Sequence, residues 1–595
     1  MKKVLSIFLC CLLLTGCAGN AVAEATYAAE EATQSAAEAV IPSVQLEPIS
    51  GGEGKYVSRF ASETVITLSD DGITVNGGGE TEEVYTSRDI IYYEDKDTYE
   101  SGNPYGEGKA ADKHPAQEAD AHLVVNITAP GAYRVSGKLA AGQIRVDLGE
   151  DAYYEPDAVV ELILDGADIT CTVAPAILFL NTYECDGSWS AENAKPDVDT
   201  SAAGANLILE NQNTVNGSYV AKIFKDKDGE KKLWKQDGAI YSYMSMNVGG
   251  SGSLDLTARN EGLDTELHLT VNSGDILIRS DNDGINTNED GVSVTTINGG
   301  CVQIYAGLGA EGDGIDSNGY LVINGGVVFA AAHPAADSGM DSDLGTYING
   351  GAVLALGSSM NQASSDSAQT SMNLQFARSQ QPGSSLVVTD ANGTVVFAYT
   401  PDAAAENRSY TGAIVSCPNL KLGSTYHVYT GGSLKGGETV GCLVDVTTVT
   451  GYEGGTQLQH AGASQAGGFG GFGGGRPDMG NFKPGERPEG EFQMPEGFPG
   501  EMPEGFDGGM PGGFDGEMPE DFDPSRFERP EGDFGGRRQA GERPKGFDPS
   551  SFEGGKMPEG MPQGGFGGRG EESQERSAEF VMSEKVLTFR SVTTE

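Results

Sequence analysis

One short pattern recurs along the middle of this chain and constrains its fold more than any other feature. It consists of a polar or acidic residue, a Gly, an apolar residue and an Asp or Asn. Copies lie at Glu261–Thr265, Asp283–Thr287, Asp313–Ser317 and Ser338–Ser342, at intervals of 22, 30 and 25 residues. A weaker copy lies at Ala239–Ser242. A period of 20–30 residues indicates one structural unit that is repeated and stacked.

A second pattern, an apolar residue followed by Asn and two Gly, comes after the later copies, at Ile297–Gly300, Ile323–Gly326 and Ile348–Gly351. Elsewhere the chain has short β-branched runs such as Val159–Leu164 and Asn206–Leu209, separated by Gly, Asp and Asn. No segment of this region has a helical period, so the sequence predicts an all-β fold. A repeat built from strands and Gly turns is typical of a coil of a parallel β-helix. We expect the Gly residues to supply turn conformations that other residues resist.

In such a coil equivalent residues stack about 4.8 Å apart along the axis. The spacing predicts an inward apolar column of Leu263, Ile285, Ile315 and Met340. It also predicts two polar columns, one of Glu261, Asp283 and Asp313 and the other of Asp264, Asn286, Asp316 and Asp341.

The polar columns need a counter-charge. Residues 280–377 contain 11 Asp or Glu and no Lys or Arg, and stacked carboxylates repel each other. Protein cations nearby in the sequence therefore cannot neutralise these columns. Calcium accepts several carboxylate and carbonyl oxygens in flexible geometry; the alternative is a set of solvated Asp and Asn turns. The predicted calcium ligands are Glu261, Asp264, Asp281, Asp283, Asn286, Glu311, Asp313, Asp316, Asp341 and Asp343.

The overall charge excludes one class of partner. The chain of 595 residues has 38 Lys and Arg against 87 Asp and Glu, a formal net charge of −49. Such a charge repels phosphate backbones, so we expect no nucleic acid partner. With 87 Gly and only 38% hydrophobic residues, part of the chain cannot be packed core.

The N-terminus carries the features of an export signal. Lys2 and Lys3 precede an apolar run, Val4–Leu14, that is too short to span a bilayer. The run ends in a lipobox-like sequence with Cys17, so residues 1–17 are predicted to be a lipoprotein signal peptide with Cys17 as the lipidated residue. We expect an exported protein, anchored to the cell membrane and facing outside, with residues 18–59 as a flexible tether.

The eight Cys residues argue against zinc and against a dense disulfide framework. Three belong to the signal and anchor, and the remaining five are Cys171, Cys185, Cys301, Cys417 and Cys442. Their number is odd and no Cys-x-x-Cys is present. A Cys417–Cys442 disulfide remains an alternative.

Several stretches together resemble a known family. They are Ile127–Gly137, Gly142–Asp147, the Asp-Gly-Ile-Asp repeats, Cys417–Gly423 and Tyr429–Gly432. The chain from about 60 to 460 resembles the bacterial carbohydrate-binding family typified by a clostridial cellulose- and pectin-binding protein. The resemblance implies a right-handed parallel β-helix, bound calcium and a polysaccharide ligand, either pectin-like or cellulosic.

Two insertions depart from the family pattern. One, at about 80–120, is rich in Tyr and acidic residues, and the other, at about 222–237, carries Lys225, Lys227, Lys231, Lys232 and Lys235. Sugar recognition uses aromatic faces together with planar polar side chains. The candidate carbohydrate-binding residues are Tyr153, Tyr183, Trp189, Trp234 and Tyr243.

Catalysis has weaker support than binding. A polysaccharide lyase needs a cationic base beside its calcium, and only Arg259 and Arg279 lie near the columns in sequence. Polygalacturonases need a His between two Gly, which neither His268 nor His333 provides. We therefore expect a cell-surface polysaccharide-binding protein and no enzyme. A lyase or glycoside hydrolase, and an adhesion or matrix protein without a glycan ligand, remain the alternatives.

The predicted organisation places the β-helix at 60–371 and a small antiparallel β cap at 372–462. Residues 463–577 are rich in Gly, Pro and Met and are predicted to be disordered. Two strand-like runs follow, so residues 578–595 are predicted to return as a strand to the cap. The Gly/Pro/Met-rich segment is then a long insertion between paired strands, whose closure entropy grows only with the logarithm of its length.

Overall fold

The computed structural model describes residues 46–51, 56–93, 106–107, 112–224, 233–358, 360–465 and 576–594. The ordered elements of these residues are almost all strands, which confirms the all-β prediction; the helical elements are the short α2 (Ala116–Ala119) and η2 (Glu150–Tyr154). The predicted signal peptide with Cys17, most of the tether and nearly all of the Gly/Pro/Met-rich segment lie outside the described residues. Within the described part, no helix is long and apolar enough to cross a membrane.

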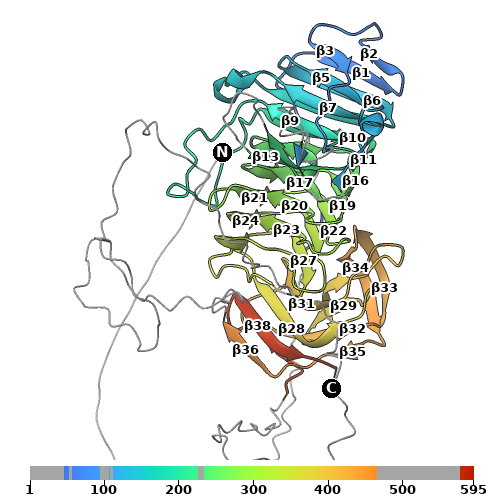
Figure 1. Cartoon of the computed structure of the whole chain (residues 1–595). Coiled ribbons are helices and arrows are strands. Elements are labelled where there is room, and N and C mark those ends of the chain that lie inside the picture. The colour runs from blue at the N-terminus through green and yellow to red at the C-terminus, as the bar shows by residue number, and fades with distance from the viewer. Residues whose placement is uncertain are drawn as a thin grey trace, which may run out of the picture. The chain divides into compact units, whose positions relative to one another are not determined.

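Three parallel ladders make up the larger part of the fold (Figure 1). The first ladder consists of β5 (Leu123–Ile127), β7 (Gly142–Asp147), β9 (Ile177–Asn181), β14 (Gly238–Ser242), β17 (Glu261–Thr265), β20 (Ile285–Thr287) and β23 (Ile315–Ser317). The strand β3 (Val84–Ser87) ends it by pairing antiparallel with β5.

The second ladder runs through β1 (Glu63–Ser69), β6 (Gly131–Leu139), β8 (Val160–Thr170), β10 (Ala205–Glu210), β15 (Met246–Gly250), β18 (Leu269–Val271), β21 (Val294–Ile297), β24 (Tyr320–Ile323) and β26 (Gly345–Ile348). The short β2 (Gly72–Val75) pairs antiparallel with β1.

The third ladder contains the end of β8, β11 (Gln212–Gly217), β16 (Ser253–Ala258), β19 (Asp275–Ser280), β22 (Cys301–Tyr305), β25 (Val327–Ala331) and β27 (Ala352–Gly357). From β14 to β25 the chain visits the first, second and third ladders in turn and then starts again. Each circuit therefore adds one strand to each ladder, and residues of successive circuits stack in register.

The interior is the apolar column that the repeat predicts. Leu263 pairs with Ile285 and Ile285 with Ile315, while Met340 forms an isolated parallel bridge to Ile315. All four side chains are fully buried in the main hydrophobic cluster. Burying this apolar surface stabilises the stack by about 25 cal/mol for each Å² removed from water.

The Gly of the four-residue pattern has a different role from the one that we expected. A Cβ on Gly284 would lie 2.1 Å from Ile304 Cγ2, and one on Gly262 would lie 2.3 Å from the Gly284 carbonyl oxygen. These Gly residues allow close packing between circuits. The prediction of special turn conformations holds instead for the Asn-Gly-Gly pattern, where φ is +89° at Gly300 and +82° at Gly326.

After β27 the pairing becomes mainly antiparallel. The remaining strands are β28 (Ser371–Gln380), β29 (Leu386–Asp390), β30 (Val395–Tyr399), β31 (Tyr410–Ser416), β32 (Thr425–Thr430), β33 (Ser433–Val440), β34 (Leu443–Glu453), β35 (Thr456–Gln457), β36 (Gly462–Gln465), β37 (Phe580–Val581) and β38 (Val586–Val592). The last strand, β38, lies between β28 and β36 and pairs with both. Phe580 and Phe589 are buried against each other with ring centroids 4.9 Å apart.

The alternative of a Cys417–Cys442 disulfide is wrong. All five Cys outside the signal region are free thiols. Cys417 Sγ lies 3.5 Å from the Val396 carbonyl oxygen, whereas Cys442 follows Gly441, which faces Cys301 on β22. The two thiols therefore face different neighbours.

Candidate functional site

The polar columns form as the repeat predicts, on β17, β20 and β23 of the first ladder. The pairing stacks Asp264 on Asn286 and Asn286 on Asp316. The same register places Glu261, Asp283 and Asp313 in the neighbouring column. We call these residues, together with Asp341, the acidic ladder.

Three oxygens of the acidic ladder are buried without a hydrogen-bond partner: Glu261 Oε2, Asp264 Oδ2 and Asn286 Oδ1. These residues are only 5%, 0% and 6% exposed. Part of the ladder is satisfied by the backbone, since the Asp313 amide donates to Asp283 Oδ1 at 2.6 Å. A buried oxygen without a partner costs free energy. A cation would therefore stabilise the β17 end of the acidic ladder, which we call its head.

Burial and neighbouring carboxylates disfavour the charged forms of these groups. Burial is the largest cause in each case, and nearby acids add to it. They raise the pKa of Asp313 to about 8 and that of Asp316 to about 6. The pKa values of Asp264 and Asp283 rise well above the usual range. Without a bound cation, the stacked acids therefore hold protons that isolated carboxyl groups would release.

The donor chemistry of the acidic ladder fits calcium, which prefers oxygen ligands and accepts amide and backbone carbonyls beside carboxylates. Within the described residues, however, no three His, Cys, Asp or Glu side chains are grouped closely enough to hold a metal. Of the predicted ligands, Glu311 and Asp343 are exposed and Asp281 is partly exposed. Neither Asp281 nor Glu311 forms a side-chain hydrogen bond to the ladder within the described part of the chain.

One residue changes the charge balance at the head of the ladder. The predicted Lys-rich insertion forms β13 (Leu233–Gln236), paired with β12 (Val220–Phe224). Lys235 Nζ lies 3.3 Å from Asp237 Oδ2 and donates a hydrogen bond to Asn288 Oδ1. The prediction concerned protein cations close to the columns in sequence; Lys235 approaches them through space from the insertion.

The structure brings two of the five aromatic candidates together. Trp189 Nε1 donates a hydrogen bond of 2.8 Å to the Tyr153 hydroxyl, and the Tyr153 ring meets Tyr154 edge to face at 4.9 Å. Trp189 is 36% exposed and Tyr154 is 78% exposed. We call Tyr153, Tyr154 and Trp189 the aromatic patch. Its partly fixed, partly exposed rings have the geometry that stacks on a flat apolar face.

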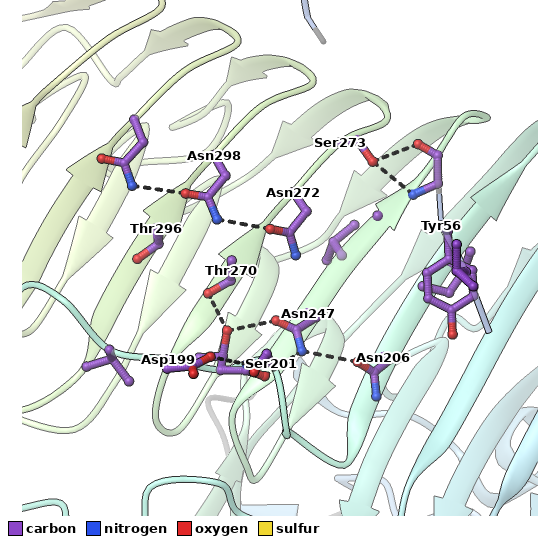
Figure 2. A pocket seen from close by; sticks show the side chains of 18 of the residues that line it. Tyr56, Asp199, Ser201, Asn206, Asn247, Thr270, Asn272, Ser273, Thr296 and Asn298 are labelled. Carbon is purple, nitrogen blue, oxygen red and sulfur yellow. Dashed lines mark hydrogen bonds between the residues drawn. The ribbon is translucent and has the colours of Figure 1, made fainter. Parts of the chain in front are cut away.

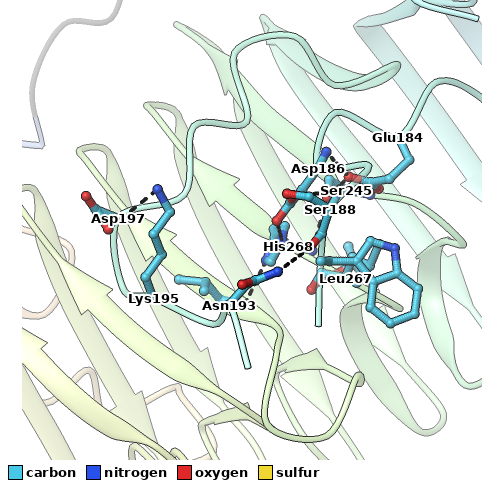
Figure 3. Close-up of polar contacts among 12 residues, drawn as sticks. Glu184, Asp186, Ser188, Asn193, Lys195, Asp197, Ser245, Leu267 and His268 are labelled. Carbon is cyan, nitrogen blue, oxygen red and sulfur yellow. Dashed lines mark hydrogen bonds and ion pairs between the residues drawn. The ribbon is translucent and has the colours of Figure 1, made fainter. Parts of the chain in front are cut away.

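Buried polar contacts hold the loop that carries Trp189 (Figure 3). Glu184 is 2% exposed and accepts hydrogen bonds from the Ser245 amide at 2.7 Å and the Ser245 hydroxyl at 2.9 Å. His268 Nε2 lies 3.5 Å from Asp186 Oδ2, and His268 Nδ1 accepts from the Val294 amide. Burial lowers the pKa of His268 despite the opposing effect of Glu184 and Asp186. The neutral ring is a structural anchor of the loop.

The other aromatic candidates do not join this patch. Tyr243 packs edge to face on the buried Tyr241 at 5.1 Å, beside the first ladder. Tyr183 is partly exposed and its amide donates to the Ala158 carbonyl. The side chain of Trp234 lies outside the described residues.

A polar groove of about 620 Å³ lies on the outer face of the second ladder (Figure 2). Its floor is a column of Asn206, Asn247, Thr270 and Thr296, which the pairing of β10, β15, β18 and β21 stacks in register. Residues 56–59 form one wall and residues 196–201 the other. Arg59 Nη2 donates to the Ser201 carbonyl at 2.6 Å, so the two walls are joined.

A second column beside this floor is a ladder of amides. Asn298 Nδ2 donates to Asn272 Oδ1, and Asn324 Nδ2 donates to Asn298 Oδ1, each at 2.9 Å. Asn349 continues the series with a bond of the same length to Asn324. We call these four exposed residues the amide ladder; the first three line the groove. Our sequence analysis missed them, although the Asn of the Asn-Gly-Gly pattern marks the last three positions; Asn272 is followed by Ser and Gly.

Comparison with known proteins finds sequences that are similar to part of this chain. Residues 121–411 match the model of a family described as carbohydrate-binding domain-containing protein. A carbohydrate-binding domain-containing protein of Acetivibrio thermocellus is 31% identical over 157 residues, which cover 26% of this chain and 45% of that protein. The chain thus spans less than half the length of this relative. The matched part of the chain is thus similar to proteins described as containing a carbohydrate-binding domain.

Among solved structures, a polysaccharide lyase-like protein from C. thermocellum, studied as a gadolinium derivative, matches at 19% identity. The match covers 48% of this chain and 92% of that protein, with a TM-score of 0.28.

Proposed function

We propose that this chain is an exported, lipid-anchored protein that binds polysaccharide on a right-handed parallel β-helix, with calcium stabilising the coils. The groove of the second ladder is the proposed glycan site. Calcium is proposed for the acidic ladder, where Asp283, Asp313, Asp316 and Asp341 would hold it after moving closer together, since no three acidic side chains of the described residues are grouped closely enough as they stand. Because the two sites belong to different ladders, calcium in this proposal supports the coils and does not contact the sugar.

The groove carries the proposal. Its amide ladder presents exposed planar amides on successive circuits, about 4.8 Å apart, and sugar hydroxyls need donors and acceptors of this kind. The floor residues are themselves buried. Asn272 stands at the groove end of the amide ladder, and its amide nitrogen donates to no other side chain among the described residues. Arg59 supplies a positive charge at one wall, and Asp197 and Asp199 supply negative charges at the other. Pectin-like and cellulosic glycans are the proposed ligand class because the family resemblance implies them.

A glycan array with the exported domain, with and without EDTA, tests this function. We expect binding to plant polysaccharides that falls in EDTA as the coils lose stability. The Asn272→Ala variant should bind less, whereas Asn349→Ala, at the far end of the same ladder, should bind like the parent. Binding that is equal in all three proteins would contradict the groove assignment.

The enzyme alternative has a separate test. Incubation with pectins and cellulosic glycans, followed by measurement of reducing ends and of unsaturated products, should show no turnover for a binding protein. Reducing ends or unsaturated products that disappear in a groove variant would establish a hydrolase or a lyase instead.

A further inference from the structure

A second groove, of about 830 Å³, continues the polar groove of the second ladder. Tyr56, Val57 and Gly250 line both grooves, so the two form one trough. The second groove crosses the turns that join the second ladder to the third, where Gly274 and Gly300 line it. Because glycine carries no side chain, a ligand in the first groove can extend over these turns into the second.

The lining of the trough is acidic. Asp197 and Asp199 line the first groove, and Glu210 and Asp275 line the second. Among the described residues that line the trough, the basic side chain is that of Arg59. The charged side chains that a bound glycan meets are therefore predominantly negative.

Arg59 offsets these acids only in part, because it already has partners in the protein. Its Nη2 donates to the Ser201 carbonyl at 2.6 Å. Its amide donates at 2.9 Å to Oε1 of Glu161, which is fully buried. Arg59 thus has a carboxyl group beside it, and a uronic acid would have to compete with these contacts.

Asp199 stays charged near neutral pH. Hydrogen bonds from the Ser201 side chain and amide hold the pKa of Asp199 below its usual value, and the amide bond is 2.9 Å long (Figure 2). Its neighbour Asp197 lies 4.0 Å from Lys195 Nζ, with both side chains well exposed. Such exposed pairs contribute little, so the wall remains negative toward a ligand.

The second groove adds a further negative charge. Burial raises the pKa of Asp275, so the charge of this groove depends first on Glu210. The Glu210 side chain is partly exposed, and its carboxylate forms no hydrogen bond or ion pair with another side chain of the described residues. A uronic acid that entered this groove would meet a carboxylate without a counter-charge.

We propose that the trough binds a neutral glycan of the cellulosic class and rejects polyuronic acids. A polyuronic acid carries a carboxylate on each sugar, and like charges brought together across an interface are costly. The net charge of −49 adds repulsion at longer range. A neutral chain meets neither repulsion and finds the exposed amides of Asn272 and Asn298. This inference rests on the groove assignment of the proposed function and selects one of its two ligand classes.

The experiment measures, by calorimetry in calcium, the affinity of the full chain for a short cello-oligosaccharide and an oligogalacturonide of equal length. We expect the neutral glycan to bind at least about tenfold more tightly. Salt screens charge, so a higher ionic strength should strengthen any binding of the oligogalacturonide and leave that of the cello-oligosaccharide unchanged. Oligogalacturonide binding that weakens with salt would mean attraction and would overturn the inference.

A charge variant tests the acids of the trough. Asp199→Asn with Glu210→Gln removes one negative charge from each groove, and Asn keeps an oxygen for the Ser201 amide. The oligogalacturonide should bind up to about tenfold more tightly than to the parent, with the affinity for the cello-oligosaccharide unchanged. The matched control, Asp71→Asn with Glu82→Gln, removes the same charges at exposed positions outside the trough and should bind like the parent. An equal gain in both variants would overturn the assignment to the trough.

The outcomes separate this inference from the proposed function. If the oligogalacturonide binds as tightly as the cello-oligosaccharide, and Asn272→Ala weakens both, the inference is wrong and the groove remains the glycan site. If neither glycan binds, the proposed function fails and the inference fails with it.

Discussion

The acidic ladder and the amide ladder are two columns of the same coil with opposite chemistry. Both consist of side chains one circuit apart, and both follow from residues at fixed places in the repeat. In the amide ladder each Asn after Asn272 donates to the Asn of the preceding circuit at 2.9 Å. In the acidic ladder the neighbours are acceptors, and three buried oxygens remain without a partner.

This difference shows which properties of a column are set by the coil and which depend on its side chains. The backbone sets the spacing between the side chains of a column. The type of side chain determines whether the stacked groups satisfy each other's hydrogen bonds or need a partner from outside the column. Amides carry both a donor and an acceptor, so their ladder is stable alone and can be exposed. Carboxylates carry acceptors only, so their ladder depends on an ion, a proton or a lysine. The experiments below test this contrast.

The largest expected effect is that of calcium on stability. An ion that binds only the native protein stabilises it by about 2.7 kcal/mol at a hundredfold excess over its dissociation constant. Asp283→Ala combined with Asp316→Ala should abolish most of the increase in melting temperature that calcium causes. The matched control is Asn298→Ala with Asn324→Ala, which should respond to calcium like the parent. If the Asp variant keeps the full calcium response, its carboxylates are only solvated turn residues.

A smaller effect is expected from pH at the loop that walls the groove. Burial lowers the pKa of His268, so the folded protein binds this proton less readily than the unfolded chain. The stability that the neutral ring gives is fully present above the unfolded pKa near 6.5 and is lost as the pH falls through the folded value. The melting temperature should therefore fall on acidification below about pH 6.5.

A variant identifies the group responsible for that effect. His268→Gln cannot gain a proton, so its melting temperature should depend less on pH between 6.5 and 5 than that of the parent. His122 is also buried with a lowered pKa, and His122→Gln serves as the comparison. An equal pH response in the parent and in both variants would exclude both rings as its source.

The repeat predicted the core and the acidic ladder because both depend on sequence spacing alone. Once Leu263, Ile285 and Ile315 are aligned, the neighbouring carboxylates must stack as well. Lys235 could not be found in this way, since it reaches Asn288 through space across 53 residues of sequence from an insertion without the repeat. The amide ladder was missed for another reason. The two Gly after Asn298, Asn324 and Asn349 explained the pattern as a turn, so no further role was assigned to the Asn, and Asn272 lies outside that pattern.

The amide ladder should contribute to ligand affinity and little to folding. Asn272→Ala removes exposed hydrogen-bonding groups at the groove, and one such bond contributes about 0.5–1.5 kcal/mol. We expect up to about a tenfold rise in the dissociation constant for the best glycan of the array, with an unchanged melting temperature. Calorimetry beside Asn349→Ala measures this. A loss of stability without a loss of affinity would give the ladder a structural role only.

The smallest expected effect is that of the aromatic patch, which lies on neither ladder. Trp189 is held by its bond to the Tyr153 hydroxyl but keeps a third of its surface exposed, so its ring can stack on a sugar without rearranging. Since the groove alone can hold a short glycan, Trp189→Ala should weaken the binding of long chains by a few fold and leave short ones unaffected.

Tyr85→Ala is the control, because Tyr85 is equally exposed at 37% but belongs to β3 at the end of the first ladder. The measurement is the affinity of the parent and of both variants for oligosaccharides of increasing length. An equal loss at every length would place the effect of Trp189 in the loop that walls the groove, whereas a loss that grows with length would extend the glycan site from the amide ladder to the patch.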